Sequence, residues 1–139
     1  MKYQVSWGRD VGNAVVTNVE ELDAVLDTIG PVDSDVAYSV AIIAEAPSDD
    51  PCPSTLDIGI GHPHRSFAYY VGAAEDSAWG FQPELAPTAD VYADYAGVVT
   101  EVWPERTRVS PDVARQAARE FVSACTQRPS CLSWDIDDE

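Results

Sequence analysis

The chain has 139 residues, and its 24 acidic and 8 basic side chains give a formal net charge of −16 at pH 7. Nucleic acid and anionic membrane are poor ligands for such a chain, because phosphate contacts need clustered Lys and Arg. The charge favours a basic protein partner, or else an acidic surface that serves solubility or adaptation to a salty cytoplasm. The length predicts a single domain, 1–139, whose core needs no disulfide bonds.

The first 16 residues contain no apolar run that suits a signal peptide, and no stretch reaches the ~18 apolar residues of a membrane span. We therefore expect a cytoplasmic protein. The cysteines Cys52, Cys125 and Cys131 lack metal-ligand spacing. A Cys125–Cys131 disulfide is conceivable, but a reducing compartment favours free thiols.

The N-terminal third predicts a hairpin and a helix. Residues 2–7 and 14–17 alternate in polarity around a turn, which is typical of paired strands. Asn18 is a good N-cap, and Glu21, three residues later, completes a capping box. An apolar stripe at helical spacing runs to residue 29, where Gly30 and Pro31 end the helix.

The middle of the chain predicts a series of strands. Residues 36–45 begin by alternating and end nearly all apolar, so they predict a long central strand; the proline-bearing segment 46–54 predicts a loop. Residues 56–60 alternate and turn through 61–64 into a strand at 66–71. Short strands at 78–81 and 98–103 flank a loop at 82–90, and residues 92–95 have no clear assignment.

Residues 110–135 give the clearest secondary-structure prediction, a helix, a turn and a short strand. Ser110 suits an N-cap and Pro111 the first helical position. Alanines at spacings of three and four give a thin buried face with Phe121 as its large anchor. Pro129 ends the unit's helical part, and residues 131–134 alternate as a short strand.

Strands are grouped between the two helices instead of alternating with them. This order predicts an α+β fold with a mostly antiparallel sheet of about six to seven strands and two helices packed on one face. We expect no internal repeat and no domain linker.

No convincing catalytic set is present. His62 and His64 would need Asp57 or Glu45 to complete a metal site, and no third ligand motif supports it. Cys52 lacks the sequence context of a nucleophile. The glycines do not form a phosphate-binding loop. A binding protein without cofactors becomes the first hypothesis.

The candidate binding surface is the stretch 75–105, which has seven carboxylates and five aromatic residues but no Lys or Arg. Aromatic anchors among charges of one sign suit an electrostatically steered protein interface. Trp79, Phe81 and Trp103 also fit strand contexts and hence the core. The predicted partner-binding residues are Glu75, Asp76, Trp79, Glu84, Asp90, Tyr92, Asp94, Tyr95 and Glu101.

Several motifs resemble one known family. The A-R-Q-A-A-R-E-F helix at 114–121, the Arg128-Pro129 turn and the Leu132-Ser133-Trp134 strand are similar to the ending of the first numbered immunity-protein family of bacterial polymorphic toxin systems. Further similarities are Trp7, the V-E-E-L helix at 19–26, the L-x-I-G-I-G strand at 56–61, and the pieces at 95–97 and 101–104. The H-P-H turn and the 46–54 loop depart from the family pattern.

The resemblance implies a cytoplasmic antidote, encoded beside its toxin, that binds and blocks the toxin domain. Members are associated with deaminase toxins, including one acting on double-stranded DNA, and with other toxin classes. Our leading hypothesis is an immunity protein that occludes a basic toxin's active site with an acidic surface, mimicking a polyanion if the toxin, a deaminase or nuclease, acts on nucleic acid. It would act as a monomer or weak homodimer. The alternatives are a small metal-assisted enzyme using His62 and His64, or a regulatory adaptor.

Overall fold

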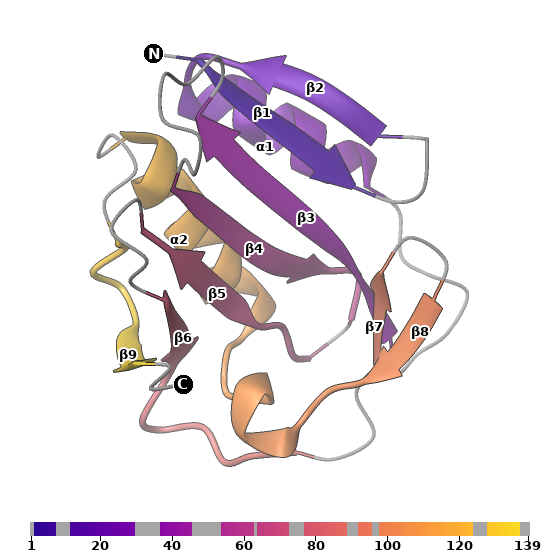
Figure 1. The fold of residues 1–139 in the computed structure, drawn as a ribbon, viewed down its shortest axis with the longest axis vertical. Helices are drawn as coiled ribbons and strands as arrows, with labels where there is room; N and C mark the ends of the chain where they lie inside the picture. The colour runs from indigo at the N-terminus through magenta and orange to yellow at the C-terminus, as the bar shows by residue number, and fades with distance from the viewer. Residues whose placement is uncertain are drawn as a thin grey trace.

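The computed structural model describes residues 2–7, 12–29, 37–45, 54–62, 64–72, 77–88, 92–95, 98–123 and 128–136. Strands and helices follow in the expected grouping (Figure 1). The strands are β1 (Tyr3–Trp7), β2 (Gly12–Val16), β3 (Ala37–Glu45), β4 (Thr55–Ile60), β5 (Ala68–Val71), β6 (Ser77–Phe81), β7 (Tyr92–Tyr95), β8 (Val98–Glu101) and β9 (Ser133–Ile136). The helices are α1 (Val19–Thr28), the 3-10 turn η1 (Pro104–Thr107) and α2 (Pro111–Ser123).

One sheet joins all of these strands in the order β2-β1-β3-β4-β5-β6-β9, with the β7–β8 hairpin attached to the start of β3. Neighbours along the main path are antiparallel, and only the β3–β7 pair is parallel. Figure 1 shows α1 and α2 together behind the sheet. The predicted α+β class, antiparallel sheet and one-sided helices are confirmed, and β7 and β8 extend the seven-strand path.

Several strand boundaries differ from the prediction, and three of the differences have a visible physical reason. The strand predicted at 98–103 ends at Glu101, because Pro104 begins η1 and leaves Trp103 70% exposed. Ser66 lies outside β5 and bridges to Val109 instead, through an N–H···O bond of 2.8 Å. The last strand begins at Ser133 because the two residues before it belong to the turn.

Helix α1 begins as predicted at Asn18, whose side-chain oxygen accepts the Glu21 N–H at 2.8 Å. The other half of the capping box is displaced by one residue. The Glu21 carboxylate accepts the Thr17 N–H at 2.8 Å and the Thr17 hydroxyl, and this hydroxyl lowers the pKa of Glu21. The two side chains still satisfy donors at the start of the helix.

Helix α2 has the thin buried face that its alanines predict. Ala114, Ala117, Ala118 and Phe121 are fully buried, and the Ser110 hydroxyl accepts the Val113 N–H at 3.3 Å. The small side chains let the helix lie close on the sheet, where it contacts β4.

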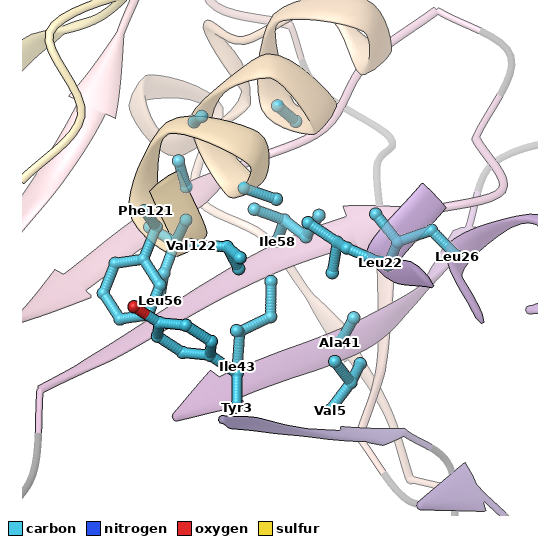
Figure 2. Packing of buried hydrophobic residues seen from close by; sticks show 14 of the residues in the cluster. Tyr3, Val5, Leu22, Leu26, Ala41, Ile43, Leu56, Ile58, Phe121 and Val122 are labelled. Atoms are coloured by element: carbon cyan, nitrogen blue, oxygen red, sulfur yellow. The ribbon is translucent and has the colours of Figure 1, made fainter. Parts of the chain in front are cut away.

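The main core lies between this helical layer and the sheet (Figure 2). Its labelled residues are Tyr3, Val5, Ala41, Ile43, Leu56 and Ile58 from the sheet, Leu22 and Leu26 from α1, and Phe121 and Val122 from α2. The Phe121 ring lies 6.0 Å from that of Tyr3 and 6.3 Å from that of Tyr70, which in turn lies 6.2 Å from Trp134. Trp134 is half-buried and reaches Phe121 through Tyr70.

Candidate partner-binding surface

The C-terminal motif residues hold the helix, turn and last strand together. The Glu120 carboxylate accepts the backbone N–H groups of Ser130 at 2.8 Å and Cys131 at 3.1 Å. The Trp134 indole N–H donates to the Pro129 carbonyl at 2.7 Å. The Glu, Pro and Trp of the motif thus stabilise the connection between α2, the turn and β9.

Cys131 is a free thiol beside this turn, and Cys52 and Cys125 lie outside the described residues. Burial, followed by the charge of Glu120, raises the pKa of the Cys131 thiol to about 11. The thiol is therefore protonated at neutral pH and is a poor nucleophile.

His62 has a structural role in the turn between β4 and β5. Its Nδ1 accepts the N–H groups of His64 at 3.0 Å and Arg65 at 2.9 Å. Burial, with the nearby charges of His64 and Arg65, lowers the pKa of His62 and favours the neutral ring that this acceptor role needs. Within the described part of the chain, no three His, Cys, Asp or Glu side chains are arranged to hold a metal ion.

The predicted binding residues fall in different parts of the structure. Trp79 is half-buried on β6, and Glu84 is exposed in the turn that follows. The remaining described positions are on the β7–β8 hairpin, where Tyr92 pairs with Glu101 and Asp94 with Val99. Tyr95 is the last residue of β7. Glu75, Asp76 and Asp90 lie outside the described residues.

The hairpin and β6 are not neighbours. Ser39 of β3 pairs with Ile60 of β4 and with Asp94 of β7, so β7 occupies the edge of β3 away from β4. Strands β3, β4 and β5 therefore separate it from β6, a distance of roughly 19 Å at ordinary strand spacing. Along the sheet the hairpin is therefore separated from Trp79 and Glu84, although Val102, which directly follows Glu101, packs on the same Val40–Phe67 cluster as Trp79.

Two arginines, which the sequence interpretation did not connect with the aromatic stretch, cover its rings on β6. The guanidinium carbon of Arg106 lies 4.4 Å from the Trp79 ring centroid, and that of Arg108 lies 4.9 Å from that of Phe81. Tyr69 stacks beside Trp79 with 4.4 Å between ring centroids. The two arginines are two residues apart in the sequence, as are the two aromatic residues, and this equal spacing could have indicated that they pair. Trp79 is a packed residue in the free protein.

These residues border a hollow of about 260 Å³ at the edge formed by β6, η1 and β9. Its lining carries both signs of charge, with Glu105 and Asp135 against the two arginines. The lining residues are Trp79, Gly80, Phe81, Glu105, Arg106, Arg108, Trp134 and Asp135.

The other described arginines also act inside the molecule. Arg65 donates to the Ala86 carbonyl at 2.7 Å, and Arg108 donates through Nε to the Leu85 carbonyl at 2.8 Å. Helix α2 uses Arg115 and Arg119 to pair with Asp27 at 2.6 Å and Asp23 at 2.9 Å of α1. Arg128 lies 5.9 Å from the Trp134 ring. In the described structure these two ion pairs engage two carboxylates, and the sequence as a whole has 16 more acidic than basic side chains.

The residues described thus define a small acidic α+β protein whose charge suits a protein partner. The family model for the immunity protein Imm1 matches residues 11–135, and the chain belongs to this family. The resemblance found in the sequence is confirmed, and membership implies a toxin as partner. No curated protein matches the chain closely enough to count as a relative. Among the described residues, no helix combines the length and apolarity that crossing a lipid bilayer requires.

Proposed function

We propose that the chain is a cytoplasmic immunity protein that binds a basic toxin domain acting on nucleic acid and occludes its active site with an acidic surface. The observation that carries this proposal is the net acidic charge. The net charge is −16, while six of the arginines stack on rings, pair across the helices or hold loop carbonyls. A surface that excludes phosphate and attracts cations suits a protein that competes with a polyanion for a basic cleft.

The predicted acidic and aromatic residues at 75–101 are proposed as one part of this surface. Long-range attraction raises association rates and is screened over about 8 Å at physiological ionic strength. Replacing Asp90 and Asp94 by Asn should therefore slow association and weaken its salt dependence. Tyr95→Ala, which removes an anchor, should raise the dissociation rate and cost about 2 kcal/mol of binding free energy.

The experiment uses the toxin domain that we expect the gene immediately upstream of this chain's gene to encode. Co-expression should restore growth of cells that make the toxin domain, and inhibition in vitro should weaken as the toxin's substrate is raised, because occlusion is competitive. Kinetics on immobilised toxin domain at two salt concentrations then test the variants. The matched control, Glu20→Gln with Asp112→Asn, removes the same charge from the helices. A toxin domain that is not inhibited by the parent protein would refute the proposed function.

A further inference from the structure

The face of the sheet opposite α1 and α2 carries an acidic residue beside a small second core around Val40 and Phe67. Asp57 on β4 is paired in register with Ile42 of β3 on one side and Tyr69 of β5 on the other. The same transverse row continues to Ser6 of β1 and to Trp79 of β6. Since register partners on adjacent strands lie about 5 Å apart, Asp57 has an aliphatic and an aromatic neighbour within contact.

Within the described part of the chain, Asp57 has no compensating partner. Its Oδ1 is buried and has no hydrogen-bond donor among the described residues. Burial raises the pKa of the Asp57 carboxyl to about 6. Of the residues paired with it, Tyr69 is the one with a titratable side chain, and the flanking residues of β3 and β4 on this face, Val40, Ala44, Thr55 and Gly59, carry no charge.

This arrangement is costly for the free protein. A carboxylate withdrawn from water needs donors or a cation, and here the described arginines are used elsewhere. Beside it, Ile42 is 40% exposed, which is high for a large aliphatic side chain at the middle of a sheet. A charge without a partner next to exposed apolar surface is typical of a contact completed by another molecule.

We propose that the part of this face around Asp57 and Ile42 binds the toxin domain and that an arginine or lysine of the toxin pairs with Asp57 while apolar toxin atoms cover Ile42. The inference rests on the proposed function and assigns the centre of its interface. A basic protein fits because the face supplies a carboxylate and the protein as a whole a surplus of negative charge. The β7–β8 hairpin attaches to β3, the strand that carries Ile42, so one partner can contact both.

The pairing makes binding depend on pH with a definite sign. A cation beside Asp57 lowers the pKa of its carboxyl in the complex, so binding releases a proton wherever the free carboxyl is protonated. Affinity is then highest above pH 6 and falls below it. Between pH 7.5 and pH 5.0, protonation of Asp57 in the free protein should weaken binding about tenfold.

The test measures equilibrium binding of the upstream-encoded toxin domain, inactivated by mutation, at pH 7.5 and pH 5.0. Asp57→Asn should raise the dissociation constant at least about 30-fold at pH 7.5 and remove the extra loss at pH 5.0. Asp112→Asn, an equal loss of charge on α2, should bind like the parent within about twofold and keep the pH effect.

A second variant places a cation next to Asp57 within the protein itself. Ile42→Arg places a guanidinium in the position paired with Asp57, so it should abolish binding while maintaining or raising the melting temperature. Its control is Val15→Arg, the same change on the same face at a position 58% exposed. Strands β1 and β3 separate β2 from β4, so an arginine at Val15 does not reach Asp57.

Failure of the inference is distinct from failure of the function. If the parent binds and inhibits the toxin domain but Asp57→Asn and Ile42→Arg bind equally well, the interface lies elsewhere and the immunity function stands. The same conclusion follows if Asp57→Asn loses affinity but keeps the parent's pH dependence. If the parent does not bind the toxin domain at all, both proposals fall.

Discussion

Replacing Asp57 by Asn should stabilise the free protein, and the gain should depend on pH. The folded-state pKa of about 6 lies above the 3.8 of an aspartate in an unfolded chain, so the folded protein binds this proton more tightly than the unfolded chain. The penalty is therefore fully present above pH 6 and disappears as pH falls below the unfolded value. For one such carboxyl, linkage gives at most about 3 kcal/mol at pH 7.5, about 2 kcal/mol at pH 5.5 and about 1 kcal/mol at pH 4.5.

Urea unfolding followed by tryptophan fluorescence at these three pH values measures the difference between parent and variant. Comparing the two proteins cancels the titration of the other 23 acidic groups, which they share. Asp112→Asn, an exposed carboxylate, serves as the control and should show no such trend. An Asp57→Asn protein no more stable than the parent at pH 7.5, or a gain that stays constant down to pH 4.5, would show that Asp57 is well solvated.

Phe121→Ala should cost about 3–5 kcal/mol because it empties a fully buried site beside Tyr3; thermal melting checks this, and an unchanged melting temperature would contradict the core. Glu120→Ala should cost about 2 kcal/mol in urea unfolding by stranding the turn's N–H donors. Glu120→Gln, which keeps an acceptor, should lose less, and equal losses would argue against the hydrogen bonds. His62→Ala with His64→Ala should still protect cells from the toxin domain; loss of protection by a folded variant would restore a contact or metal role.

The sequence predicted the features that depend on neighbours along the chain. The Asn18 cap, the start of α2 after Ser110 and the alanine face of α2 all follow from local spacing. Strand β7 could not be assigned from the sequence, because four residues give little periodicity. Its partner, β3, is also distant in the sequence. Likewise, Ser66 lies outside the predicted strand because it bridges to Val109, which is distant in the sequence.

The binding surface was harder to predict for the same reason. The stretch without basic residues is continuous in sequence, but Arg106 returns to stack on Trp79. Asp57 was considered as a metal ligand, and its place between Ile42 and Tyr69 depends on the register of three strands. One sequence signal was available: the strand at 36–45 is apolar on both faces. A face that only contacts water does not need apolar side chains, so this pattern could have indicated a contact on the second face.

The C-terminal turn and the proposed partner-binding surface use different residues. Glu120, Pro129 and Trp134 connect α2 to β9, while the sheet surface around Asp57 and Ile42 belongs to other strands and makes none of those bonds. Side chains on that surface can therefore be exchanged without loosening the connection. An engineer could randomise Ile42, Asp57 and their solvent-facing neighbours and select antidotes against new toxins on an unchanged scaffold.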